Sequence, residues 1–144
     1  MTSRSLLDTG PLVALLNRRD RYHRWAVGQW ADLRSPLVTC EPVLTEACFL
    51  LRHISGASRT VMQFIERGAL NVAYQVEPDA VALGRLLDSY ANVPMSLADA
   101  CLVRMAEQLS GARVFTVDRD FRIYRAHGRR VIPTIMPVDV RAGQ

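Results

Sequence analysis

The chain has 144 residues, 49% of them hydrophobic, which is enough to build the core of one ordinary domain; we therefore expect a single domain over residues 1–144. The net charge of +4 suits a polyanionic partner such as nucleic acid. All 18 cationic residues are arginines, and lysine is absent. The absence of lysine excludes functions that need a catalytic lysine, including Walker-A phosphate loops and Schiff-base enzymes.

Hydropathy and cysteine usage indicate the compartment. No apolar run approaches the ~18 residues of a membrane span, and no basic-then-apolar signal precedes the first predicted strand. Cys40, Cys48 and Cys101 form no C-x-x-C pair and have apolar neighbours, which is typical of reduced core thiols. We therefore expect a cytoplasmic protein with no membrane contact.

The first half of the chain alternates short apolar runs with helical patterns. Ser5–Asp8 is an apolar run that ends on an acid, and the Thr-Gly-Pro that follows predicts a turn into a helix. The charged run 18–24 is interpreted as a solvated loop, with phosphate contact as the alternative. The predicted elements of this half are a strand over 5–8, helices over 12–17 and 25–33, a strand over 36–40 and a helix over 41–54.

The second half continues the alternation. Ser58 is predicted to cap a helix that ends at Gly68, and Ser96 to cap one that ends at Gly111. The other predicted elements are a strand over 70–74, a helix from 77 to about 91, a strand over 112–117, a basic turn over 125–130 and an edge strand over 131–133. The alternation predicts an α/β fold, a three-layer α/β/α sandwich with a central, mainly parallel sheet.

Four acids stand at the ends or edges of these elements. Asp8 and Asp118 follow predicted strands, Asp99 begins a helix, and Glu46 lies at the boundary of a helix's apolar face. If the strands are parallel and adjacent, their carboxyl ends converge and the acids become neighbours.

Each acid also has a purely structural interpretation. Asp8 is explained by helix capping, Glu46 by ordinary exposure, and Asp99 by the capping box that Ser96-x-x-Asp99 resembles. Only the four together favour a site. Clustered carboxylates repel one another, and with no lysine in the chain a hard divalent cation is the natural counterion. All-oxygen ligands suit Mg²⁺ or Mn²⁺, and such ions can activate water for phosphodiester hydrolysis.

Four segments, LLDTGPLVALL, LTEACFLL, SLADACLV and FTVDRDF, in this order and spacing, resemble the PIN-domain nucleases, and most of all the VapC-type toxins of toxin-antitoxin pairs. The resemblance implies a PIN-like fold and metal-dependent endonucleolytic cleavage of RNA. It also implies a cognate antitoxin that occupies the cleft, and a homodimer. One departure is Gly10, where many relatives carry serine.

The resemblance also implies roles for individual residues. Mg²⁺ or Mn²⁺ would be held by Asp8, Asp99 and Asp118, with Glu46 completing the catalytic set. The auxiliary positions that match the family, or that lie beside its motifs, are Thr9, Thr116 and Asp120. Independently of the resemblance, Arg119 and Arg122 flank the last motif and could contact substrate phosphates, and they are equally well interpreted as solvent-facing helix residues.

Three rival functions stay open on the sequence. A receiver-like phosphotransfer domain would also place an aspartate after its first strand, but the missing lysine and the absence of a D-x-D-x-T start at Asp8 oppose it. A second rival is a catalytically silent RNA-binding or assembly module of the same fold, which the complete acidic set opposes. The third is a PIN-type nuclease in general RNA processing.

Overall fold

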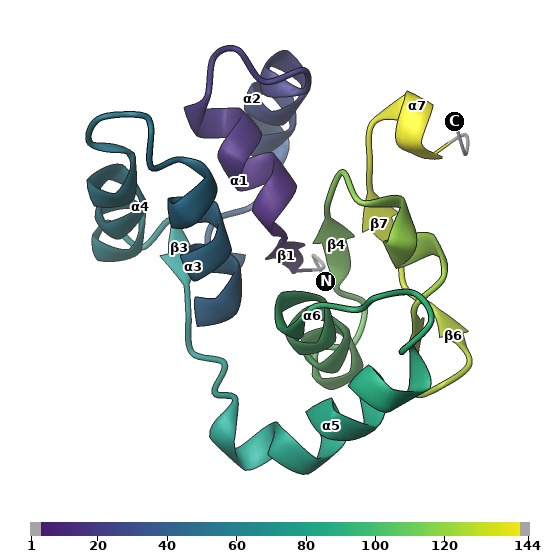
Figure 1. Ribbon diagram of the computed structural model, residues 1–144. Helices are drawn as coiled ribbons and strands as arrows, with labels where there is room; N and C mark the ends of the chain where they lie inside the picture. Colours follow the sequence, from purple (N-terminus) through teal and green to yellow (C-terminus); the bar gives the residue numbers. More distant parts are fainter. Residues whose placement is uncertain (1–3, 142–144) are drawn as a thin grey trace.

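The computed structural model describes residues 4–141 and places a five-stranded sheet between two layers of helices (Figure 1). The strand order is β3-β2-β1-β4-β7, and all four neighbouring pairs are parallel. The expected three-layer α/β/α sandwich with a mainly parallel sheet is confirmed. The strands of this sheet are β1 (Ser5–Leu7), β2 (Leu37–Val38), β3 (Leu70–Asn71), β4 (Arg113–Phe115) and β7 (Thr134–Ile135).

The helices cover both faces of the sheet, with α1 to α4 on one side and α5 and α6 on the other (Figure 1). They are α1 (Thr9–Leu16), α2 (His23–Asp32), α3 (Glu41–Leu50), α4 (Ala57–Glu66), α5 (Ala80–Ser89), α6 (Leu97–Gln108) and the terminal turn α7 (Val138–Arg141). Two short 3₁₀ helices are η1 (Glu77–Asp79) and η2 (Arg119–Arg122). Within the described residues, none of the helices combines the length and apolar character needed to cross a membrane.

Successive side chains along each strand point to opposite faces of the sheet, and both faces are buried. In β1, Leu6 belongs to the cluster against α6 while Leu7 belongs to the cluster against α1 and α3, and both are fully buried. Val114 and Phe115 divide in the same way in β4. Strands covered on both faces need such continuous apolar runs, which is why the sequence shows runs instead of alternating polar residues.

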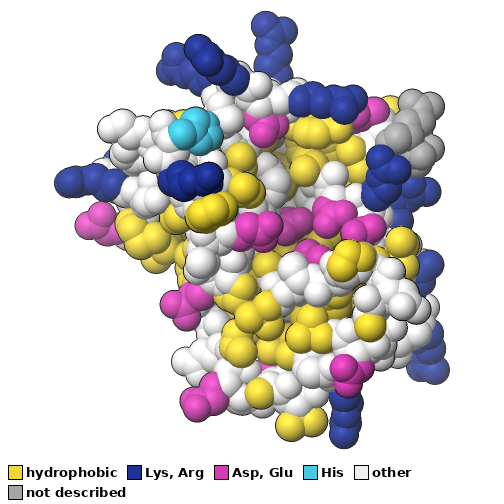
Figure 2. Space-filling model, in the orientation of Figure 1, with side chains coloured by type: hydrophobic (Ala, Val, Ile, Leu, Met, Phe, Trp, Pro, Cys, Tyr) yellow, Lys and Arg dark blue, Asp and Glu magenta, His cyan; other side chains and the backbone are white. Residues whose placement is uncertain are grey.

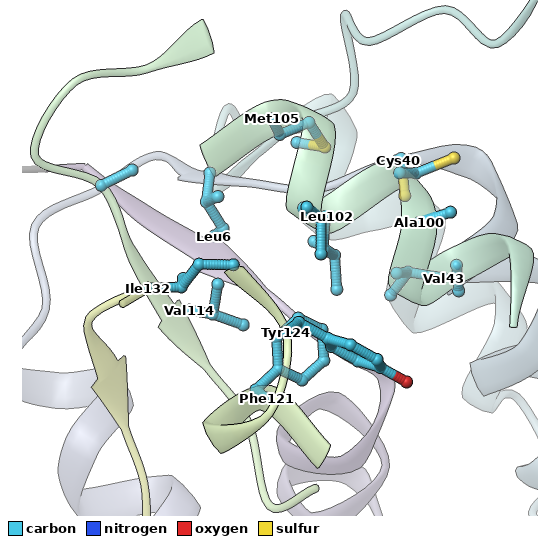
Figure 3. Packing of buried hydrophobic residues seen from close by; sticks show 14 of the residues in the cluster. Leu6, Cys40, Val43, Ala100, Leu102, Met105, Val114, Phe121, Tyr124 and Ile132 are labelled. Carbon is cyan, nitrogen blue, oxygen red and sulfur yellow. The ribbon is translucent and has the colours of Figure 1, made fainter. Parts of the chain in front are cut away.

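The cluster against α6 contains two aromatic residues that matter for the site. Phe121 and Tyr124 are fully buried, and their rings meet edge to face with centroids 5.1 Å apart. Figure 3 shows the two rings side by side under Leu102, with the Tyr124 oxygen pointing away from the apolar side chains.

Several predicted boundaries were wrong, and two of the errors have a clear local reason. The helix expected after Ser58 begins two residues earlier than a Ser58 cap allows, because Gly56 takes a left-handed φ of 77° and is itself the N-cap. The strand expected over 70–74 stops at Asn71, whose Oδ1 accepts a hydrogen bond from the backbone N–H of Ala73 at 3.1 Å. The helix expected over 41–54 ends at Leu50.

The C-terminal prediction was also wrong. The basic run contains β5 (Arg125–Ala126), which pairs antiparallel with β6 (Arg130–Val131) in a separate hairpin. The turn is made by His127 and Gly128, with φ of 54° and 75°. The edge strand of the main sheet is β7, three residues further on, and it follows Pro133, whose carbonyl accepts the Val114 N–H at 2.9 Å.

Candidate active site

A cleft of about 530 Å³ opens at the carboxyl edge of the sheet, where the chain order reverses. β1 is central, β2 and β3 extend the sheet to one side, and β4 and β7 extend it to the other. The crevice beyond β1 and β4 is the position at which open α/β sheets bind ligands. All four predicted acids line this cleft: Asp8, Glu46, Asp99 and Asp118. Figure 2 shows a strip of acidic side chains across the middle of the molecule.

Asp8 lies at the floor of the cleft and is 5% exposed. It is the N-cap of α1, and its Oδ1 accepts the Thr9 N–H at 2.7 Å. Its Oδ2 accepts the hydroxyl of Thr116 at 2.6 Å. Burial, reinforced by the charges of Asp99 and Asp118, raises the pKa of Asp8 to about 7, although the two hydrogen bonds oppose this shift.

Asp99 combines the capping role with a place in the cleft. Its backbone N–H donates to Ser96 Oγ at 3.0 Å, and its Oδ2 accepts the Ser96 N–H at 3.2 Å, so the predicted capping box is present. The same Oδ2 accepts the hydroxyl of Tyr124 at 3.0 Å. Burial raises the pKa of Asp99, and the charge of Asp118 adds to the shift. The capping box therefore helps to orient a carboxylate that also lines the cleft.

Thr116 connects two of the acids. It is fully buried, donates its hydroxyl hydrogen to Asp8, and accepts the backbone N–H of Asp118 at 2.9 Å. Asp118 stands three residues beyond β4 and caps η2, with its Oδ1 accepting the Asp120 N–H at 2.9 Å. One threonine thus fixes both a carboxylate and the start of the segment that carries another.

Glu46 reaches the cleft from an exposed position on α3. Its Oε2 accepts the hydroxyl of Thr9 at 3.1 Å. Because Thr9 also donates its backbone N–H to Asp8, this residue links the two acids through separate groups. From the boundary of the apolar face of α3, Glu46 therefore reaches the residue that follows Asp8.

Asp120, Arg119 and Arg122 do not line the cleft. Burial, with the charge of Asp118, raises the pKa of Asp120, but it is the Asp120 backbone that contacts Asp118. Arg119 and Arg122 are exposed residues of η2. Any phosphate contacts made by these two arginines would therefore lie outside the cleft.

The four carboxylates of the cleft are ligands of the type that a hard divalent cation prefers, but their side chains are not yet arranged close enough together to coordinate one. Among residues 4–141, no three His, Cys, Asp or Glu side chains are grouped as a metal site. Within the same part of the chain, no ion pair joins an arginine to Asp8, Glu46, Asp99 or Asp118. Carboxylates that crowd one another without a cationic partner, one of them with its pKa raised to about 7, match the all-oxygen preference of Mg²⁺ and Mn²⁺.

Sequence reasoning missed several contributors. Asp20, Arg21 and Tyr22 line the cleft, although the run 18–24 was interpreted as a solvated loop. Asp139 of α7 holds this wall, because its Oδ2 accepts Arg21 Nη2 at 2.7 Å and the Tyr22 hydroxyl at 2.8 Å. Both partners are more than 100 residues away in sequence, so no local pattern pointed to them.

Gly10 packs directly against the segment that leads to Asp118. A Cβ atom at position 10 would run into Cγ2 of Val117, closer than side chains approach one another. Both residues line the cleft. The absence of a side chain at Gly10 therefore leaves the space that the Val117 side chain occupies.

Comparisons with known proteins agree with this architecture. The family model described as PIN domain matches residues 5–126. No curated protein matches the sequence. Among solved structures, the chain is similar to the crystal structure of Mycobacterium tuberculosis VapC20, a Sarcin-Ricin loop cleaving toxin. The TM-score is 0.69 at 21% identity, over 81% of this chain and 91% of that one.

Proposed function

This chain belongs to the PIN-domain family, and we propose that it is a Mg²⁺- or Mn²⁺-dependent endoribonuclease that hydrolyses phosphodiester bonds in RNA. The observation that carries the proposal is the convergence of Asp8, Glu46, Asp99 and Asp118 in one cleft with no arginine paired to them in residues 4–141. An acidic cleft repels a phosphate backbone unless a cation stands between them. The composition as a whole, at +4, nevertheless suits a polyanion.

Each side chain has a defined task in this proposal. Asp8, Asp99 and Asp118 hold the metal, and Glu46 completes the set at the rim. A bound divalent ion would supply activation of water and neutralisation of charge on the phosphate oxygens. Thr116 and Thr9 orient Asp8 through their hydrogen bonds, and Tyr124 orients Asp99. Because burial raises the pKa of Asp8 to about 7, a substantial fraction of this carboxyl is protonated at neutral pH, and a bound cation would favour its ionised form.

We further propose that the protein is a cytoplasmic toxin of a toxin-antitoxin pair and acts as a single-domain homodimer. VapC20, whose fold this chain shares, is described as a toxin that cleaves the Sarcin-Ricin loop. An apolar groove of about 760 Å³ between α3 and α6 adjoins the cleft and shares Glu46 and Ser96 with it. Phe49 and Leu97 in this groove are 60% and 44% exposed. Exposed apolar surface of this kind supports a protein partner, the antitoxin, beside the acids.

The experiment is cleavage of structured RNAs by the purified protein with Mg²⁺, with Mn²⁺ and with EDTA. We expect cleavage only with metal, and at least a hundredfold loss in Asp8→Asn and Asp99→Asn. Asp88→Asn, on an exposed turn of α5, removes the same charge and should cleave normally. Cleavage that persists in EDTA or in both site variants would contradict the metal site. Metal-dependent RNA binding without any cleavage would favour a catalytically silent module instead.

A further inference from the structure

The excess positive charge of the chain is concentrated in two segments. The run 119–130 holds five arginines and one aspartate, a net charge of +4 that equals the net charge of the whole chain. The run 18–24 holds four arginines and one aspartate, a net charge of +3. The rest of the chain is therefore close to neutral or slightly acidic. A charge distribution this uneven is a surface feature that a polyanion would recognise.

Both segments adjoin the cleft. Asp20, Arg21 and Tyr22, in the middle of the first segment, line one of its walls. The second segment starts immediately after Asp118, which lines the cleft from another element. Figure 2 shows dark-blue side chains above the acidic strip and more of them down the right-hand edge, below the end of the strip. The apolar groove between α3 and α6 occupies a third side.

Six of these arginines are available to a ligand: Arg18, Arg19, Arg24, Arg122, Arg129 and Arg130 are all exposed, and none forms an ion pair with another residue in 4–141. Two others are engaged. Arg21 is paired with Asp139 at 2.7 Å. Arg125 directs Nη1 at the carbonyl oxygens of Arg122, Ile123 and Tyr124, at 2.8 to 3.1 Å.

The internal contacts of the second segment hold its arginines in place. By binding three successive carbonyls, Arg125 fixes the corner between η2 and β5. The hairpin turn is fixed by Glu107, whose Oε2 accepts the His127 N–H at 2.6 Å, and by the positive φ of 54° at His127. A fixed frame lowers the entropy lost when its exposed side chains bind a ligand.

The hairpin lies some distance from the acids. Glu107, which contacts the hairpin turn, is eight residues beyond Asp99 on α6, and at 1.5 Å per residue this separation is about 12 Å along the helix. This separation places Arg129 and Arg130, in the same hairpin, away from a phosphate that lies at Asp99. They are placed to meet nucleotides farther along the strand.

We propose that the arginines of 18–24 and 119–130 form two phosphate-contact surfaces, so that a single RNA strand enters along one segment, crosses the cleft and leaves along the other. The inference rests on the proposed ribonuclease function. It adds the path of the substrate and the requirement for RNA that extends several nucleotides from the cleavage point. Arginine suits this role because its planar guanidinium contacts phosphate oxygens in pairs.

The test measures binding in EDTA, where the proposed nuclease cannot cleave. The probes are two fluorescein-labelled single-stranded RNAs, one of about 20 nucleotides and one of about four. The turn variant carries Arg18→Gln, Arg19→Gln and Arg24→Gln, and the hairpin variant Arg122→Gln, Arg129→Gln and Arg130→Gln. The control carries Arg59→Gln, Arg67→Gln and Arg85→Gln, three exposed arginines of α4 and α5 and the turn after α4.

Each test variant should bind the long RNA roughly tenfold more weakly. The magnitude of the slope of log K against log salt should fall by up to about 2, because each of the three lost phosphate contacts accounts for about 0.7. Because Arg129 and Arg130 lie far from the acids but Arg122 lies only four residues beyond Asp118, the hairpin variant should lose less affinity for the short RNA than for the long one. Equal losses in the control would overturn the proposal, because net charge alone would then explain them. Arginine-dependent binding without cleavage in Mg²⁺ or Mn²⁺ would leave the path standing and refute the nuclease function. Cleavage in Mg²⁺ or Mn²⁺ with unchanged binding in both test variants would support the nuclease function and refute the proposed path of the RNA.

Discussion

The cost of burying Asp8 gives the sharpest prediction. The substitution is Asp8→Asn, studied without metal. The pKa of Asp8 is raised from 3.8 to about 7 in the folded protein, a difference of about three units. At 1.36 kcal/mol per unit, the ionised carboxylate lowers the free energy of unfolding by about 4 kcal/mol above pH 7. The substitution removes that penalty. Asparagine has one side-chain oxygen instead of two, so the Thr116 hydroxyl loses its acceptor at position 8, at a cost of about 1 kcal/mol.

The sign of the pH dependence follows from the direction of the shift. Between pH 3.8 and about 7 the folded protein keeps a proton on Asp8 that the unfolded chain has lost, so the stability of the wild type falls as pH rises through this window. Asp8→Asn lacks this dependence. We expect the variant to be slightly less stable than the wild type near pH 4 and more stable by about 2–3 kcal/mol at pH 8, which corresponds to roughly 5–10 °C in Tm.

The assay is urea or thermal unfolding in EDTA at several pH values, with Asp88→Asn as the control for removal of one exposed charge. Addition of Mg²⁺ or Mn²⁺ should then stabilise the wild type and not Asp8→Asn, by about 2.7 kcal/mol at one hundred times Kd. If the stabilities of wild type and variant run parallel from pH 4 to pH 8, the carboxyl of Asp8 is not destabilised by its burial and the reasoning fails.

Two further substitutions test the neighbours of the acids. Tyr124→Phe keeps the buried ring but removes the hydroxyl that donates to Asp99 at 3.0 Å. The cleavage rate should fall about tenfold, while the free energy of unfolding should fall by only about 1 kcal/mol. An unchanged cleavage rate would show that this hydrogen bond does not orient Asp99. Gly10→Ala should destabilise the protein by about 1–3 kcal/mol because its Cβ meets Val117, and adding Val117→Ala should restore stability. Additive losses in that double variant, measured by thermal unfolding, would contradict the contact.

Much of the fold followed from local chemistry that the sequence displays. The apolar runs before Asp8 and Asp118 predicted buried parallel strands, and Ser96-x-x-Asp99 predicted a capping box that is present. The errors arose where one side chain or one backbone angle decided a boundary, as at Gly56 and Asn71. Such decisions involve about 1 kcal/mol and leave little trace in hydrophobic periodicity.

The sequence by itself determined which residue types could build the site. Acids at the ends of apolar elements, together with the absence of lysine, indicated a carboxylate cluster that needs a cation, and the structure brings all four to one cleft. Only the tertiary structure decided how they are held. Tyr124 reaches Asp99, Thr116 joins Asp8 to Asp118, and Asp139 secures the opposite wall. These hydrogen bonds join residues that no local pattern relates, because burial and hydrogen-bond geometry depend on which elements pack together.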